Sequence, residues 1–338
     1  MKAIFLTLAA TAAASKHSHT GYGPLNPVLG THGYPDCVPG PQGISSDIEA
    51  NQFSMVCSQR PAPATALKIA CVGDSITAGA HSSGGDHPYP QQLQLLLDPT
   101  NYSVTNLGAC GSTMQKGADS PYWKRPQFAA LTASKWDVVV VMLGTVRACV
   151  QGGTGRAASS PPAPSHGTSP PPPPPPPPPQ NDAKDAVDGG PKNWGCGTDM
   201  ANITVESCQF AQDYLAFIAL LRTLGPSPGQ APVIYLAAPP PLMQHGSIGA
   251  NQTVINSVYP VLIPMIAQAA NVSTVPVSVY AGMGGVPDWE AAFPSSCTKD
   301  STWPACAWWC DNQSCDQCHP NDNGYTHLAR VIRAGLDL

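Results

Sequence analysis

Charged residues are scarce in this sequence: they make up 11% of its 338 residues, against roughly 25% in an average globular protein. That composition excludes a coiled coil and a highly charged helical bundle. Lys and Arg together number 16, against 21 Asp and Glu, and they form no cluster. Because phosphate backbones are bound by clustered positive charge, we expect no nucleic-acid partner.

Long apolar runs are also lacking. No stretch reaches the roughly 20 apolar residues that a membrane helix needs, and the last residues form no hydrophobic tail for a lipid anchor. We therefore expect no stable membrane insertion. Lys2, the apolar run 3–10 and the small residues 12–15 have the layout of a signal peptide, which we place at 1–14.

Two further features agree with export. The sequence contains twelve cysteines, and disulfides persist in oxidising compartments. Asn-x-Ser/Thr sequons occur at Asn101, Asn202, Asn251, Asn271 and Asn312. The sequence thus predicts a soluble, secreted, extracellular glycoprotein.

The chain divides by composition into a leader and a folded domain. Residues 15–66 are rich in Gly and Pro, without helical or alternating periodicity, and predict an extended leader that Cys37 and Cys57 could tie together. From 67 to 338 strand and helix patterns alternate, interrupted by a Pro-rich segment at 146–180.

This alternation predicts the fold class. Short apolar or β-branched runs predict strands at 68–72, 102–107, 136–143, 233–238 and 275–280. Helical spacing predicts helices at 90–97, 208–221, 253–270 and 323–334, the third kinked or divided by Pro260 and Pro264. Such βαβ units predict a three-layer α/β/α domain with a five-stranded, mainly parallel sheet. In such sheets the reacting groups lie at the carboxyl ends of the strands.

Three segments at predicted strand ends carry groups suited to nucleophilic catalysis. The turn Gly73-Asp74-Ser75 follows the first strand and places a hydroxyl before a helix. The segment 106–113 follows the second strand, and its glycines allow a backbone N–H to approach a substrate. Near the end of the chain, Asp316 precedes His319 by three residues, so the carboxylate can orient an imidazole that takes the Ser75 proton.

These residues resemble the SGNH (GDSL) hydrolase family, whose blocks are a Gly-Asp-Ser turn, a Gly, a Gly-x-Asn-Asp motif and Asp-x-x-His. The resemblance runs from about residue 68 to the C-terminus. It implies a flavodoxin-like α/β/α fold and a triad of Ser75 as nucleophile, His319 as base and Asp316 as orienter. It also implies an oxyanion hole made by the backbone N–H groups of Ser75 and Gly111 and by the Asn of the third block.

The third block is interrupted. Gly144-Thr145 is followed by Val146, and the expected Asn-Asp appears only at Asn181, so that joining Thr145 to Asn181 restores the motif. The intervening residues 146–180 contain no acidic or aromatic residue and end in ten consecutive prolines before Gln180. We interpret them as a retained in-frame intron, and a genuine Pro-rich surface insertion is the alternative.

Other polar residues have simpler interpretations. His327 is a rival base, but it falls within a predicted helix and is expected to be a structural or solvated side chain. Asp74 is expected to cap a turn or helix rather than to take part in catalysis.

The cysteines near His319 allow three interpretations. The run 315–319 reads C-x-x-C-H, which is the c-type haem attachment signature, and Cys306, Cys310, Cys315 and Cys318 have zinc-like density. We favour disulfides, in which Cys315 and Cys318 brace the loop with Cys306 and Cys310 as available partners. Cys71 is expected to remain a thiol, and Cys196 to pair with Cys208.

The predicted function is a secreted serine esterase that needs no cofactor and no metal. Segments 181–194 and 235–241 look like the carbohydrate O-acetylesterase branch of the family, which implies an acylated small molecule or glycan as substrate. The alternatives are a lipid-directed esterase or lysophospholipase, and a catalytically impaired secreted binding module if the insertion displaces Asn181.

Overall fold

The computed structural model describes residues 37–39, 55–57, 63–118, 120–145, 196, 202–244, 250–274, 279–312, 315 and 317–338. These residues belong to one compact unit, Asp36–Leu338. Among the helices in these ranges, none has both the length and the apolar character needed to cross a membrane.

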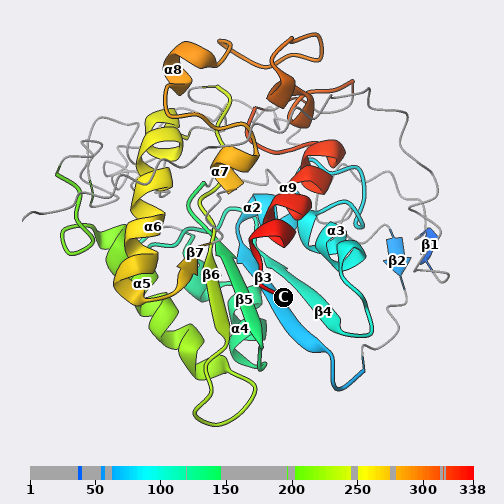
Figure 1. Cartoon of the computed structure of the whole chain (residues 1–338), viewed down its shortest axis with the longest axis vertical. Coiled ribbons are helices and arrows are strands. Elements are labelled where there is room, and N and C mark those ends of the chain that lie inside the picture. The colour runs from blue at the N-terminus through cyan, green and yellow to red at the C-terminus, as the bar shows by residue number, and fades with distance from the viewer. Residues whose placement is uncertain are drawn as a thin grey trace, which may run out of the picture. The chain divides into compact units, whose positions relative to one another are not determined.

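A parallel sheet forms the centre of the fold (Figure 1). Its strands are β3 (Leu67–Gly73), β4 (Tyr102–Gly108), β5 (Val138–Met142), β6 (Val233–Leu236) and β7 (Ser273–Thr274). They lie in the order β4-β3-β5-β6-β7, and every neighbouring pair is parallel. The predicted five-stranded sheet is confirmed, and its order is that of a doubly wound, flavodoxin-like fold. The winding direction reverses at β3, which is where such folds place their reacting groups.

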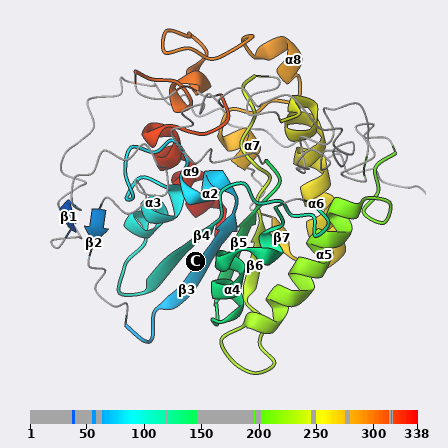
Figure 2. The same ribbon diagram turned by 180° about the vertical axis from the view of Figure 1, so that it is seen from behind.

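Helices cover both faces of this sheet (Figures 1 and 2). The longer ones are α3 (Tyr89–Leu96), α4 (Pro126–Thr132), α5 (Gln209–Leu221), α6 (Tyr259–Ala270) and α9 (Asp322–Gly335). The short ones are α2 (Ser75–Ala78), α7 (Val279–Gly282) and α8 (Trp289–Ala292), with η2 (Tyr122–Lys124), η3 (Arg222–Leu224), η5 (Val254–Val258) and η6 (Pro304–Trp308). In both views α3 and α9 lie on one side of the sheet and α4, α5 and α6 on the other, as the three-layer prediction requires.

The central strand β5 shows why the sheet is buried on both sides. Val138 and Val140 pack into the cluster that contains residues of α3 and α9, whereas Val139 and Val141 pack into the cluster of α5 and α6. Each fully buried valine contributes about 1.5 to 3 kcal/mol relative to an exposed one. A β-branched run without polar residues is therefore stable only between two helical layers.

The last predicted strand differs in the structure. The last strand was expected at 275–280, but β7 ends at Thr274, residues 275–278 lie outside the described ranges, and Val279 and Tyr280 begin α7. That part of the prediction is wrong because α7 packs against α9, and tertiary packing overrides β-propensity. The helix expected at 253–270 is confirmed, with an irregularity at Pro260, where the π-helical turn η5 runs directly into α6. Pro264 lies inside α6 and does not divide it.

The leader contains a short hairpin-like pair. Strands β1 (Cys37–Pro39) and β2 (Met55–Cys57) are antiparallel, with Cys37 opposite Cys57 in the register. The signal peptide at 1–14, the rest of the leader up to residue 62 and the Pro-rich segment at 146–180 lie outside the described residues. The domain boundaries therefore stay predictions.

Candidate active site

Ser75 lies at the carboxyl end of β3, in the first turn of α2. The turn from strand to helix is tight, because a Cβ on Gly73 would lie 1.9 Å from the Thr77 hydroxyl oxygen. Only glycine fits there. The Ser75 side chain is buried, with 1% of its surface exposed.

His319 reaches Ser75 from the other end of the chain. Its Nε2 lies 2.8 Å from the Ser75 Oγ, across 244 residues of sequence. The loop that carries it is held by a hydrogen bond from the Met243 N–H to the Gln317 carbonyl, at 2.9 Å. On its other side Asn321 caps α9 by accepting from the Gly324 N–H at 3.0 Å. The structure brings this predicted pair together, whereas Asp316 lies outside the described residues.

Asp74 connects the ends of β3 and β5. One carboxylate oxygen accepts from the Ile76 N–H at 3.1 Å and so caps α2. The other accepts from the Thr145 hydroxyl at 2.5 Å and from the Thr145 N–H at 3.2 Å. Burial raises the pKa of this carboxyl, and the hydrogen bonds from Thr145 and Ile76 oppose the rise. The capping role expected for Asp74 is confirmed.

The loop after β4 lies beside the Ser75 turn. Ala109 donates its N–H to the Gly73 carbonyl at 2.9 Å, and a Cβ on Gly108 would lie 2.1 Å from the backbone nitrogen of Ala78. Gly111 has a φ of 72°, a left-handed conformation that suits glycine. Within the described ranges, the backbone N–H groups of Ser75 and Gly111 donate no hydrogen bond. Asn181, the third predicted donor, lies outside these ranges.

The rival base His327 is engaged elsewhere. Its Nε2 lies 2.9 Å from the Gly282 carbonyl oxygen, and its ring stacks on Trp308 with centroids 3.9 Å apart. Burial lowers the pKa of this imidazole. These contacts agree with the structural role expected for it.

Disulfides decide between the interpretations of the cysteine cluster. The bonds Cys297–Cys306 and Cys310–Cys315 lie in the His319 region, so these sulfurs can neither ligate zinc as thiolates nor attach haem as thioethers. The disulfide expected for Cys318 is wrong, because Cys318 is a buried thiol. Cys306, one of the partners expected for it, is bonded to Cys297, nine residues upstream.

Two further cysteine predictions are confirmed. Cys196 pairs with Cys208, and Cys71 in β3 is a buried thiol. Burial raises the pKa of the Cys71 thiol to about 12, so it stays protonated and unreactive at neutral pH.

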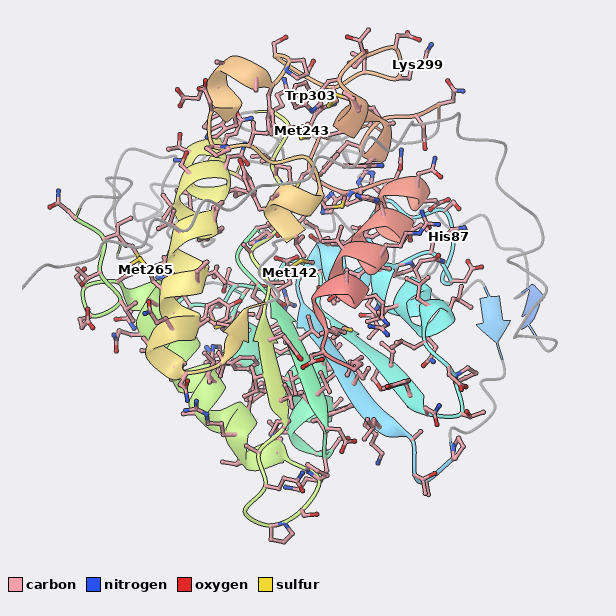
Figure 3. The ribbon with its side chains drawn as sticks, viewed as in Figure 1. His87, Met142, Met243, Met265, Lys299 and Trp303 are labelled. Carbon is pink, nitrogen blue, oxygen red and sulfur yellow. A yellow bond between two sulfur atoms is a disulfide. The ribbon has the colours of Figure 1, made fainter. Side chains whose placement is uncertain are left out.

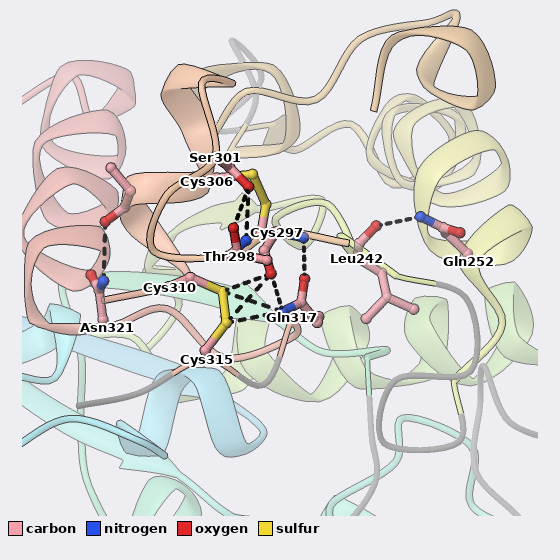
Figure 4. The surroundings of a disulfide bond; sticks show 11 residues. Leu242, Gln252, Cys297, Thr298, Ser301, Cys306, Cys310, Cys315, Gln317 and Asn321 are labelled. Carbon is pink, nitrogen blue, oxygen red and sulfur yellow. Dashed lines mark hydrogen bonds between the residues drawn. A yellow bond between two sulfur atoms is a disulfide. The ribbon is translucent and has the colours of Figure 1, made fainter. Parts of the chain in front are cut away.

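Sequence reasoning missed Gln317 (Figure 4). Its side-chain oxygen accepts from the Cys297 N–H at 2.6 Å. Its amide nitrogen donates to the Cys297 carbonyl at 2.9 Å and to the sulfurs of Cys310 and Cys315 at 3.2 and 3.1 Å. Gln317 therefore attaches the His319 loop to both nearby disulfides. No local pattern signals this, because the contacts join residues up to 20 apart.

The assembled groups suit nucleophilic acyl transfer. A serine hydroxyl within hydrogen-bond reach of an imidazole can lose its proton as it attacks a carbonyl carbon. Unbonded N–H groups nearby can stabilise the negative oxygen that this attack creates.

Comparison with known proteins agrees with this chemistry. The sequence profile of the GDSL-like Lipase/Acylhydrolase family matches residues 71–327, which is more than half of the chain. An acetylxylan esterase of Xylanibacter ruminicola is 40% identical over 87 residues, which cover 25% of this chain and 18% of that protein. The chain thus spans less than a fifth of that relative's length.

Solved structures show weaker likenesses. The native aryl esterase of M. smegmatis is 15% identical with a TM-score of 0.45, over 80% of this chain and 100% of that one. Est24, a carbohydrate acetylesterase from Sinorhizobium meliloti, is 14% identical with a TM-score of 0.44, over 79% and 97%. TM-scores this low support no inference about the chemistry of this chain.

Proposed function

This chain belongs to the GDSL-like lipase/acylhydrolase family, and we propose that it is a secreted serine esterase that removes small acyl groups, chiefly O-acetyl groups from carbohydrate. The observation that carries the proposal is the 2.8 Å contact between Ser75 Oγ and His319 Nε2. Such a contact is the geometric requirement for a base-activated nucleophile.

In the acylation half of the reaction, Ser75 Oγ attacks the ester carbonyl carbon and passes its proton to His319 Nε2. The carbonyl oxygen becomes an oxyanion. When this intermediate collapses, the carbon–oxygen bond to the alcohol breaks, and the alcohol leaves with the proton held by His319. Ser75 is then acylated.

In the deacylation half, water attacks the acyl-enzyme and gives a proton to His319. Collapse of the second intermediate breaks the bond to Ser75 Oγ, which recovers the proton, and the carboxylic acid leaves. In this proposal Asp316 would accept a hydrogen bond from the other ring nitrogen and stabilise the imidazolium in both halves.

The oxyanion would be bound by the N–H groups of Ser75 and Gly111 and by the Asn181 amide. The first two belong to adjacent loops joined by the bond between Ala109 and Gly73. One such donor typically contributes about 2.7 to 4 kcal/mol of transition-state stabilisation.

The carbohydrate substrate is supported by the local identity to an acetylxylan esterase. That identity covers a quarter of this chain, so the substrate class needs its own measurement. The proposal needs neither a metal nor another cofactor, since serine, histidine and backbone N–H groups supply each proton transfer and charge interaction.

Secretion is supported by two features besides the signal-like segment 1–14. Three disulfides occur within the described ranges, as is usual for oxidising compartments. Among the sequons, Asn101, Asn202, Asn271 and Asn312 are exposed and open to glycan attachment. Asn251 is buried, and its side-chain oxygen accepts from the Thr253 and Val254 N–H groups.

The decisive test is the turnover of an aryl acetate by the wild type and by Ser75→Ala. We expect the substitution to lower kcat by about 10³-fold or more, because only binding and the oxyanion donors then remain. A fluorophosphonate probe should label wild-type Ser75 and not the variant. Normal turnover by Ser75→Ala would end the proposal.

The substrate class follows from a second measurement. Acetylated glycans and aryl esters of increasing acyl length are compared by kcat/KM. We expect acetyl esters to be preferred and acetate to be released from glycans. A preference for long acyl chains or lysophospholipids would favour the lipid-directed alternative, and the absence of turnover with retained glycan binding would favour the binding module.

A further inference from the structure

His81 lies flat against the proposed base. The rings of His81 and His319 are parallel within 3°, with centroids 5.0 Å apart, which is an offset-stacked arrangement. His319 is 1% exposed, whereas His81 is exposed. One face of the His319 ring therefore has a second imidazole as its neighbour.

The backbone at His81 is held in an unusual conformation. Its φ is 65°, a left-handed value that non-glycine residues seldom adopt. Ser82 supports the turn by donating its hydroxyl to the Gly79 carbonyl at 2.7 Å. Such a conformation persists only where surrounding contacts determine it.

Those contacts come from α9, the helix that starts three residues after His319. Before His81, the Ala80 carbonyl accepts from the Tyr325 hydroxyl at 2.6 Å. After it, Ser83 donates its N–H at 2.9 Å and its hydroxyl at 2.5 Å to the Asp322 carboxylate. Both sides of His81 are thus bonded to the helix that continues from the His319 loop, and the two rings are fixed within one hydrogen-bonded unit.

We propose that His81 is a positioning residue for His319: its ring fixes the plane of the His319 imidazole so that Nε2 faces Ser75, and its charge sets the acid limit of activity. This inference rests on the proposed esterase function. Because His319 must be neutral to accept the Ser75 proton, a positive charge on the stacked ring disfavours its premature protonation.

Other charged groups surround this pair. Asp74 lies before α2, Asp86 and His87 lie on the same loop as His81, and Asp322 lies at the start of α9. His87 Nδ1 lies 2.9 Å from an Asp86 carboxylate oxygen, and His87 Nε2 lies 3.7 Å from an Asp322 carboxylate oxygen. Figure 3 shows His87 beside α9. Asp74 accepts from Thr145. Asp86 and Asp322 thus have His87 as their partner. Asp74 also interacts electrostatically with His319, and Asp316 is the proposed hydrogen-bond partner of its ring, whereas His81 is in ring contact with it.

The kinetic test compares two variants across about pH 5 to 9 with an aryl acetate. His81→Ala removes the stacked ring, and we expect kcat to fall about 10-fold or more with little change in KM, because a misplaced base costs rate rather than binding. His81→Phe keeps a flat ring without charge and should recover most of kcat at high pH. Its acid limb in kcat/KM should move up by about half a pH unit, since a like charge near 5 Å in a wet site has been removed.

His87→Gln is the matched control, because it removes the other histidine of this loop, which has no ring contact with His319. We expect its kcat and acid limb to match the wild type. An equal shift of the acid limb in His87→Gln would mean that any positive charge on this loop affects the acid limb, and would overturn the assignment to His81. Wild-type kcat and acid limb in both His81 variants would overturn it as well.

Nuclear magnetic resonance separates this inference from the esterase proposal. The His319 ring is titrated in Ser75→Ala and in Ser75→Ala/His81→Phe, so no turnover is needed. We expect a higher His319 pKa in the double variant, and equal values would refute the role of His81 whatever the activity. Thermal melts of each variant report folding, so that a loss of kcat in an unfolded His81→Ala is not counted as support, and His81→Phe then decides.

Discussion

At the scale of single residues, the Asp74 side chain connects the ends of β3 and β5 by hydrogen bonds. Asp74→Ala leaves the N–H groups of Ile76 and Thr145 and the Thr145 hydroxyl without their acceptor. We expect it to lower the free energy of unfolding by about 2 kcal/mol or more. Asp74→Asn keeps an oxygen acceptor and should cost less, and urea denaturation measures both. Equal stabilities of the two variants would contradict this role.

The raised pKa of the Asp74 carboxyl also predicts how the free energy of unfolding depends on pH. Burial raises its pKa in the folded state above the ordinary value of 3.8, so the folded protein binds this proton more tightly than the unfolded chain. Its contribution to stability is therefore full below 3.8 and is lost as the pH rises through the raised pKa. We expect the difference in unfolding free energy between wild type and Asp74→Asn to follow this trend in denaturation curves over pH, and a difference that is constant with pH would refute it.

The proposed triad predicts that kcat falls by different amounts when different members are substituted. His319→Ala removes the base and should lower kcat by about 10³-fold or more. Asp316→Asn should cost less, because the role proposed for Asp316 is to orient the imidazole and not to transfer the proton. Steady-state kinetics on an aryl acetate tests the order, and a larger loss for Asp316→Asn would contradict the assigned roles.

At the scale of elements, the loop between Cys315 and α9 owes its shape to Gln317. This residue has a φ of 68° and makes four side-chain hydrogen bonds to Cys297, Cys310 and Cys315. Gln317→Ala loses the bonds and keeps the unfavourable backbone, whereas Gln317→Gly loses the bonds but suits that φ. We expect lower Tm and kcat in both, with Gly the less destabilised. Wild-type kcat in both would show that the loop is held without Gln317.

The effect of the Cys310–Cys315 disulfide on the His319 loop can be tested separately. Cys310→Ala/Cys315→Ala removes the disulfide at the start of this loop, and we expect kcat to fall because the position of His319 is no longer fixed. Cys196→Ala/Cys208→Ala is the control, since it removes a disulfide at the start of α5 and should affect stability more than kcat. Mild reductant should reproduce the first effect, and unchanged activity in reductant would contradict it.

At the scale of the whole molecule, residues 146–180 separate Thr145 from Asn181, the third proposed oxyanion donor. Thr145 is fixed beside Ser75 by its two bonds to Asp74, so the residue that follows it starts from a defined point. Joining Thr145 to Asn181 would put the Asn181 amide one residue beyond that point. In the chain as written, 35 residues that are rich in proline and poor in large apolar side chains intervene.

We therefore expect the mature transcript to lack these codons, and a chain without 146–180 to be the more active esterase. Loss of one oxyanion donor predicts about 10²- to 10³-fold lower kcat for the chain as written. Sequencing of cDNA and kinetics of both forms test this. If every transcript keeps the proline codons and both forms are equally active, the segment is a genuine insertion.

Much of the architecture was determined by the sequence, because it depends on local patterns. The all-apolar β5 required two helical layers, and the glycine-lined turn after β3 placed a serine at a strand end. Pro260 indicated an irregularity in the helix predicted at 253–270, and it lies in the first turn of α6, a position that proline favours. The family blocks, which are also local, identified Ser75, Gly111 and His319 as candidates.

What only the tertiary structure decided are the contacts between distant segments. The approach of His319 to Ser75 spans 244 residues, and the bond between Thr145 and Asp74 spans 71. The tertiary structure also decided that Cys306 pairs with Cys297 and that His81 stacks on His319. It decided as well that Val279 and Tyr280 are helical. No sequence window contains both partners of the long-range contacts, and at Val279 packing against α9 outweighs the local preference for a strand. Their geometry exists only once the helical layers have closed on the sheet.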